Sequence, residues 1–351
     1  MGRGSLGILC LGVLGGCSAE PDLPPLEIFS ERVAIAVIDE HPPCAGDLAA
    51  LDTHVREVER LSGFSGAETI DVYLGSVDER CRGFPMEFVQ GCYRHGLDAV
   101  FSPWGVVHHE IAHAVARDFR FDSRFWSEGF AEVASGVMSQ KSELEVLTTE
   151  QLSDRYVFAN YVSTGHLARY LVETRGWGAY RAVLERGSEA GLGLTEEALF
   201  QEYEREAPAA YPPRPSSCDF PELETDGGDW SERFRFSCEA SEATQYEYLG
   251  RSASRGAAVI RSVELDAGTY EMESMGGDGF ILVGCLTDVL DVLPDEPPEG
   301  DLDNEVDHWT GQFFPSGVRH RISVTRGQYR VALSSGTEAE AAMEFHIRRV
   351  D

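Results

Sequence analysis

The sequence predicts an α+β domain followed by an all-β sandwich domain, and three observations support this fold class. Strand-like segments come first and amphipathic helices follow them up to about residue 207. A proline-rich segment at residues 208–217 then interrupts the regular patterns. Beyond it, in residues 218–351, short alternating segments separated by glycine turns dominate. The 351 residues are enough for two such domains.

The first sixteen residues have the pattern of a secretory signal peptide. Arg3 precedes the apolar run Leu6–Leu14, which is shorter than the roughly 20 residues needed to span a bilayer. The residues Leu14-Gly15-Gly16-Cys17 resemble the lipobox of bacterial lipoproteins, in which cleavage leaves the cysteine as a lipidated N-terminus. The resemblance implies a signal peptide at 1–16, a lipid on Cys17 and a tether at 17–30. An ordinary signal peptide with a chance cysteine is the alternative.

These features predict an exported protein that is lipid-anchored in the bacterial cell envelope. Ser18 after the cysteine favours the outer membrane, on its periplasmic or surface side, by analogy with enteric bacteria. The chain carries 60 acidic and 29 basic residues, a formal charge of −31. Such a charge argues against nucleic acid as a partner and against broad electrostatic contact with anionic lipid.

Six cysteines remain after Cys10 and Cys17 are set aside. An even number in an exported protein predicts disulfide bonds, and Cys81–Cys92 is the predicted local pair. Since three cysteines precede residue 210 and three follow it, full pairing needs an odd number of bonds between the halves. The other pairings stay open among the rest: Cys44, Cys218, Cys238 and Cys285.

The N-terminal domain is predicted over residues 31–207. Clusters of β-branched and apolar residues predict strands at 31–38, 69–74 and 97–101, the last at a sheet edge. Residues 80–96 are predicted to be irregular. Apolar residues at helical spacing, with Asp47 and Thr195 as caps, predict the following helices: 47–61, 106–117, 125–135, 155–174, 177–186 and 195–206.

The C-terminal domain is predicted to contain strands at 257–265, 269–274, 280–285, 319–324 and 328–333. The segments Val263–Tyr270 and Ile322–Tyr329 repeat one pattern, in which an alternating strand, a glycine turn and a tyrosine follow each other. This layout resembles the bacterial pre-peptidase C-terminal domain. The acidic segment 288–307 is a candidate calcium site or a solvated loop. The aromatic residues after it are a candidate ligand platform or core residues: Trp309, Phe313 and Phe314.

An HExxH motif lies in one of the predicted helices, at His109-Glu110-Ile111-Ala112-His113. Residues i and i+4 share a helix face, so both imidazoles can reach one metal ion. Neutral imidazole is a good zinc ligand. Glu110 is offset around the helix and can act as a general base on a zinc-bound water. The alternative is a helix with two ordinary histidines. His108 is out of register and is predicted at the helix surface or the rim of a substrate site.

A third zinc ligand is expected on the next helix. Glu128 and Glu132 form an i,i+4 pair, and their mutual repulsion would be relieved by a nearby cation. Glu128 as a ligand, with Glu132 accepting an N–H from a ligand histidine, satisfies this requirement. Two solvated glutamates are the alternative, which Phe125, Trp126 and Phe130 beside them disfavour.

The motifs HEIAH and WSEGFAE resemble those of the gluzincin metallopeptidases, specifically the peptidase MA-like group. The resemblance implies a zincin-like fold, a Zn²⁺ ion held by His109, His113 and Glu128, and Glu110 as the base, with Glu132 behind the ligands. The stretch Tyr161–Leu171 resembles a further helix of that group. Tyr161 is the candidate stabiliser of the oxyanion, with the alternatives Tyr156, His166 and Tyr170; at His166 the family more often has a small residue.

The expected function is that of a zinc metallopeptidase, which hydrolyses peptide bonds of a peptide or protein substrate through a zinc-activated water. One alternative is a catalytically degenerate peptidase-fold lipoprotein that acts as a binding or assembly factor in the cell envelope. Another is an adhesive lipoprotein in which HExxH is accidental.

Overall fold

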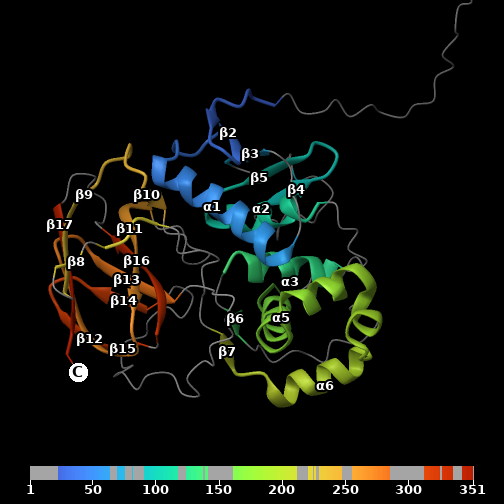
Figure 1. Ribbon diagram of the computed structural model, residues 1–351. Coiled ribbons are helices and arrows are strands. Elements are labelled where there is room, and N and C mark those ends of the chain that lie inside the picture. The colour runs from blue at the N-terminus through green and yellow to red at the C-terminus, as the bar shows by residue number, and fades with distance from the viewer. Residues whose placement is uncertain are drawn as a thin grey trace, which may run out of the picture.

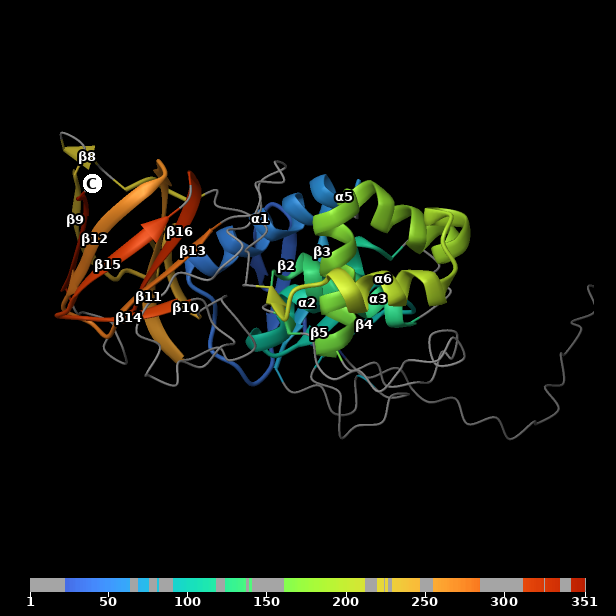
Figure 2. The same cartoon turned by 90° about the horizontal axis from the view of Figure 1, so that it is seen from below.

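The computed structural model describes an α/β region (residues 23–211) and a two-sheet region (residues 220–350), which lie side by side (Figures 1 and 2). Among the described residues, no helix is long and apolar enough to cross a membrane. The predicted signal peptide, Cys17, Tyr156, the segment 288–307 and Trp309 lie outside the described residues. Those residues are 23–63, 69–75, 81, 91–117, 124–136, 139–140, 161–211, 220–223, 225–226, 229–246, 255–284, 312–324, 326–334 and 342–350.

A five-stranded sheet forms one layer of the α/β region, in the order β1-β2-β3-β5-β4. β2, β3 and β5 are parallel, and the two edge strands β1 and β4 are antiparallel to their neighbours. The strands have these bounds: β1 Ile28–Phe29, β2 Val33–Val37, β3 Ile70–Leu74, β4 Cys92–Arg94 and β5 Ala99–Ser102.

The three predicted strands of this sheet are confirmed, but three other predictions about this part of the chain are wrong. β5 is not at the edge, because β4 lies outside it, and β4 falls within the segment that was predicted to be irregular. The last part of the predicted tether is also built into the structure, since β1 pairs with β2. Strands of two and three residues are too short to produce an alternating pattern, which explains why neither was predicted.

The helices of the α/β region lie where the periodicity predicts them. They are α1 (Ala45–Ser62), the 3-10 turn η2 (Trp104–Val106), α2 (Val107–Val115), α3 (Arg124–Ala134), α5 (Tyr161–Leu192) and α6 (Glu196–Glu206). α5 joins two predicted helices and is interrupted at Gly176 and Gly187, each with a φ of +78°.

One of the two predicted helix caps is confirmed. The Thr195 hydroxyl accepts a hydrogen bond from the Ala198 backbone N–H at 3.2 Å, at the start of α6. The N-cap of α1 is Cys44 and not Asp47. Asp47 lies three residues further on, where its carboxylate accepts a hydrogen bond from the Cys44 backbone N–H at 2.7 Å, so it completes a capping box.

One hydrophobic core joins a face of the sheet to the helices. It contains Val72 from β3, Leu51 from α1, Ile111 from α2, Phe130 from α3 and Leu171 from α5. The helices α2 and α3 that carry the candidate metal ligands are therefore fixed on a common core.

The two-sheet region consists of two five-stranded antiparallel sheets with the orders β10-β11-β16-β13-β14 and β15-β12-β17-β9-β8. Val263 and Leu333 from the first sheet share a core with Met272 and Phe345 from the second. The strands have these bounds: β8 Thr225–Asp226, β9 Asp229–Arg235, β10 Ala243–Tyr246, β11 Arg255–Leu265, β12 Gly268–Met275, β13 Gly279–Gly284, β14 Gln312–Pro315, β15 Arg319–Val324, β16 Gly327–Ser334 and β17 Ala342–Arg349.

The two repeated glycine-turn segments lie at connections between the two sheets. Both connections, β11 to β12 and β15 to β16, carry the chain from one sheet to the other. All five predicted strands are present, whereas β8, β9, β10, β14 and β17 were not predicted. Phe314 is buried in the shared core and stacks on Phe280 with ring centroids 4.8 Å apart, so it is a core residue and not part of an exposed platform.

Part of the predicted proline-rich linker forms a short β-strand. Ala210–Tyr211 forms β7, which pairs with β6 (Ser139–Gln140). The rest of that linker, from residue 212, lies outside the described residues.

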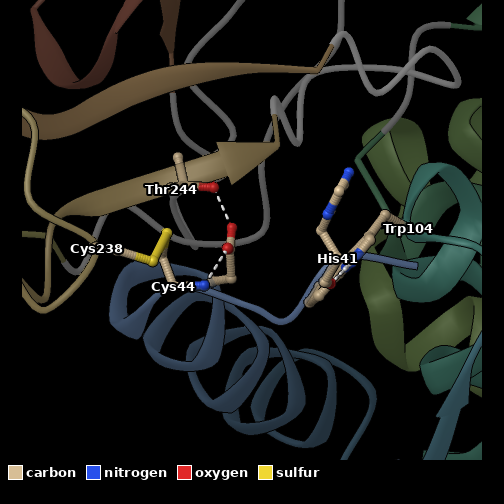
Figure 3. The surroundings of a disulfide bond; sticks show 6 residues. His41, Cys44, Trp104, Cys238 and Thr244 are labelled. Atoms are coloured by element: carbon tan, nitrogen blue, oxygen red, sulfur yellow. Dashed lines mark hydrogen bonds between the residues drawn. A yellow bond between two sulfur atoms is a disulfide. The ribbon is translucent and has the colours of Figure 1, made fainter. Parts of the chain in front are cut away.

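The two regions are joined at the N-terminal end of α1 (Figure 3). A disulfide links Cys44 to Cys238, and the Ala45 backbone N–H donates to the carbonyl of Cys238 at 2.8 Å. The Thr244 hydroxyl of β10 donates to the Asp47 carboxylate. The predicted pair Cys81–Cys92 is confirmed as a second disulfide. Cys218 and Cys285 lie outside the described residues.

Candidate metal centre

α2 brings the two histidines of the HExxH motif together on one face. His109 and His113 are one turn apart, and their Nε2 atoms lie 3.2 Å from each other. Both side chains keep a small exposed fraction, 12% and 15%. The motif therefore presents two imidazole nitrogens at one point, as the spacing predicts.

α3 supplies the third group. Oε2 of Glu128 lies 3.1 Å from Nε2 of His109 and 3.2 Å from Nε2 of His113. Two ligand atoms bound at about 2.0–2.1 Å to a tetrahedral zinc ion lie about 3.3 Å apart. The spacing of the three atoms and the His-His-Glu donor set thus fit a zinc ion, and these residues form a group that could hold a metal.

Three glutamates are buried around the two histidines: Glu110, Glu128 and Glu132 are only 5–7% exposed. Burial raises the pKa of Glu128, but the neighbouring His113 and His109 outweigh it and hold that pKa well below its usual range. Burial alone would lower the pKa of His109, yet its hydrogen bonds with Glu128 and Glu132 raise it to about 10. Buried carboxylates are destabilised unless positive charge lies next to them, and a metal dication would supply that charge.

Each histidine also contacts a second group through its other ring nitrogen. Oε1 of Glu132 lies 3.2 Å from Nδ1 of His109, the kind of contact that the sequence predicts for Glu132. The Ser127 hydroxyl lies 3.3 Å from Nδ1 of His113. Such contacts fix the orientation and tautomer of a ligating imidazole. Ser127 was not predicted, because its only signal in the sequence is its position directly before Glu128.

Glu110 lies close enough to His109 and His113 to feel their charge, and it also lies against the residues of the edge strand β4. A Cβ atom on Gly91 would lie 2.7 Å from Cγ and 2.8 Å from Oε1 of Glu110. The Tyr93 backbone N–H donates a hydrogen bond to the Glu110 carboxylate. Burial raises the pKa of Glu110, although the two histidines oppose this effect. The contact with β4 was not predicted, because β4 itself was not.

α5 approaches α3 closely behind Glu132. A Cβ atom on Gly165 would lie 2.8 Å from Cβ of Glu132, so the absence of a side chain at this position permits the approach. Tyr161 is the first residue of α5, and its side chain lies outside the described residues, so its predicted role stays a prediction.

Two of the other candidates for an oxyanion group, His166 and Tyr170, face α6. His166 is fully buried, and its Nδ1 lies 2.8 Å from the hydroxyl of Tyr203. The Tyr170 hydroxyl donates to Glu202 at 2.9 Å. The larger residue at position 166 therefore fills the contact between α5 and α6.

His108 packs on α1 and is not a free surface residue. Its backbone carbonyl accepts a hydrogen bond from Nε2 of His54 at 2.9 Å, and the two rings meet edge-on with centroids 4.6 Å apart. The side chain is thus only partly at the helix surface, because α1 covers one side of it, and its predicted place at a substrate rim stays a prediction. 

The chain matches no family model and has no significant match among curated protein sequences. The class of site therefore rests on the residues and their geometry.

Proposed function

We propose that this protein is a zinc-dependent peptidase of the gluzincin type, with a zincin-like α/β region followed by a β-sandwich. The observation that carries the proposal is the convergence of His109, His113 and Glu128 beside a buried Glu110. A structural cluster would not require this combination of two imidazoles and a carboxylate at zinc-ligand spacing with a further carboxylate next to them.

The chemistry is divided between the ion and the protein. Zinc held by His109, His113 and Glu128 would supply Lewis acidity and lower the pKa of water. Glu110 takes the proton from the water that attacks the peptide carbonyl and delivers it to the leaving amine. Glu132 and Ser127 keep the imidazoles oriented.

The position of β4 supports an extended peptide as the substrate. β4 is the last strand in the sheet order, and its Tyr93 lies next to Glu110. An extended chain that adds to a sheet edge is held by backbone hydrogen bonds, which are independent of its sequence. A peptide paired with β4 would pass beside Glu110.

The test uses the chain from Ser18 onwards, incubated with a diverse peptide mixture, with the products identified by mass spectrometry. We expect cleavage by the wild type and a loss of about 10²- to 10⁴-fold in kcat for Glu110→Gln, with one zinc per chain retained. His113→Ala should lose the zinc as well. Glu185→Gln, an exposed glutamate on α5, is the matched control and should behave as the wild type.

Two results would reject the peptidase. Equal cleavage by the wild type and Glu110→Gln would show that the activity comes from elsewhere. Bound zinc without cleavage by either would favour the binding or assembly factor in the envelope.

We also propose that the protein is an exported lipoprotein. The lipobox-like sequence at Cys17 supports this, and two disulfides agree with an oxidising compartment. Incorporation of labelled palmitate in a bacterial host, lost in Cys17→Ser, tests the anchor. Equal labelling of both chains would reject it.

A further inference from the structure

The edge strand β4 is fixed at both ends next to the metal site. At its first residue, Cys92 is bonded to Cys81, and both sulfur-bearing residues are buried together with Tyr73 and Phe101. Beyond its last residue, Arg117 donates to both carboxylate oxygens of Asp98 in the turn between β4 and β5, at 2.8 and 2.6 Å.

The ion pair between Arg117 and Asp98 connects β4 to α2, the helix that carries the HExxH motif. Arg117 follows the end of α2, and Asp98 also accepts a hydrogen bond from the Tyr93 hydroxyl at 2.6 Å. Arg117 therefore connects the end of α2 to the strand next to it. The strand also pairs with β5 through Cys92 opposite Phe101.

Directly before β4, at Gly91, the chain touches Glu110. Gly91 leaves no room for a side chain, since a Cβ atom would lie 2.7 Å from Cγ and 3.1 Å from Cδ of Glu110. The next contact is the Tyr93 backbone N–H, which donates to the same carboxylate. One side of the Glu110 carboxyl group is thus defined by backbone atoms of residues 91–93.

We infer that the Cys81–Cys92 disulfide and Gly91 are positioning elements for Glu110: they hold β4 at the distance that sets the Glu110 carboxylate beside His109 and His113. The inference rests on the proposed function for its effect on catalysis, whereas the contact itself can be measured without activity. A general base must be placed within hydrogen-bond reach of the proton it takes, and an error of about 1 Å can cost roughly 10²-fold in rate.

Two different variants test the two elements, one for Gly91 and one for the disulfide, and both should lower kcat. In Gly91→Ala, the new methyl group meets the flexible end of Glu110 and displaces the carboxylate, while the backbone stays in place. In the double variant Cys81→Ser/Cys92→Ser, β4 is released at its first residue. Both should reduce kcat by about 10²-fold with KM within about threefold of the wild type, and both should still bind one zinc per chain.

The controls are matched within the same chain. Gly96→Ala lies in the same β4–β5 hairpin, where a Cβ atom would meet nothing within 4 Å. Cys44→Ser/Cys238→Ser removes the other disulfide, which does not involve β4. Measured below their melting temperatures, both controls should keep kcat within about threefold of the wild type.

A readout independent of activity is amide hydrogen exchange at Tyr93. We expect the exchange to be faster in Gly91→Ala and in the double serine variant than in the wild type and the controls. If the wild type cleaves no peptide but the exchange differs in this way, the proposed function fails and the positioning contact stands. Unchanged exchange, or full kcat in Gly91→Ala, overturns the inference. If Gly91→Ala melts far below the wild type, the double serine variant decides in the same way.

Discussion

Each of the two histidines in the candidate metal centre is held by a second contact at its other ring nitrogen, and the two contacts differ in strength. His109 has a carboxylate, Glu132, at its second nitrogen, whereas His113 has the Ser127 hydroxyl. A hydrogen bond to an ionised acceptor is roughly twice as strong as one between neutral groups. Glu132 therefore contributes more to the orientation of the ligands than Ser127, and its charge also acts on the cation.

Glu132→Gln removes that charge with little change in volume. We expect its affinity for zinc to fall by about 10- to 100-fold, and that of Ser127→Ala to fall less. Competition with a chromophoric chelator at neutral pH measures both constants, with Glu185→Gln as the control for a lost surface charge. An affinity of Glu132→Gln equal to that of the wild type would show that the contact with His109 is incidental.

His54 predicts a pH dependence of stability. Burial lowers its pKa to about 4, although the hydrogen bond to the His108 backbone opposes this. Because the unfolded chain binds the proton with a pKa of about 6.5, His54 destabilises the fold as the pH falls from about 6.5 to 4. The integrated effect is at most about 3 kcal/mol. Above pH 6.5 it is absent.

Urea unfolding of the wild type and His54→Gln between pH 4 and 8 tests this dependence. Both chains contain the same other titrating groups, so the difference between their unfolding free energies reports the titration of His54 together with its electrostatic coupling to the neighbouring His108. That difference should change in favour of the variant as the pH falls below 6.5. A constant difference across the whole range would mean that His54 titrates normally.

The sequence contains enough information to predict the candidate metal ligands and too little to predict the residues around them. His109 and His113 follow from helical spacing, and Glu128 follows from its pairing with Glu132 on the next helix. Ser127, Gly91 and His54 act through contacts between segments that are distant in the chain. No periodicity marks such contacts, so only the folded structure reveals them.

At the scale of elements, the site depends on how closely α5 packs on α3. Gly165→Ala places a methyl group 2.8 Å from Cβ of Glu132, an atom that cannot move without the backbone of α3. We expect a loss of about 1–3 kcal/mol in the free energy of unfolding. Gly178→Ala is the control in the next segment of α5, beyond the interruption at Gly176, where a Cβ atom would meet nothing within 4 Å.

Urea unfolding of both glycine variants gives the comparison. The control should be neutral or stabilised by up to about 1 kcal/mol, because alanine is the better helix former. Equal stabilities of the two variants would mean that α5 can shift away from α3 without cost.

The helices and strands also show which elements a sequence pattern predicts well and which it does not. Helices with an apolar face, such as α1 and α6, were located within a few residues. β9 has only Trp230 and Phe234 facing the core among seven mostly charged or polar residues, and β4 has three residues. Their pairing partners, and not their own sequences, make them strands.

At the scale of the whole molecule, α1 connects the two regions. Its N-terminal end is bonded to the two-sheet region through Cys44–Cys238, and its middle holds α2 through His54. The sequence predicted an odd number of disulfides between the halves but could not select the partners, because Cys44 and Cys238 are 194 residues apart.

The two disulfides should differ in their effect on stability because they close loops of very different length. The chain-entropy relation gives about 5 kcal/mol for the separation of 194 residues and about 3 kcal/mol for the separation of 11. Cys44→Ser/Cys238→Ser should therefore lower the midpoint of urea unfolding more than Cys81→Ser/Cys92→Ser does. Peptide cleavage below the midpoints should show the reverse order, since only the short loop holds β4 against Glu110. If one double variant had both the lower urea midpoint and the lower cleavage rate, the two disulfides would not differ in whether they mainly stabilise the fold or position Glu110.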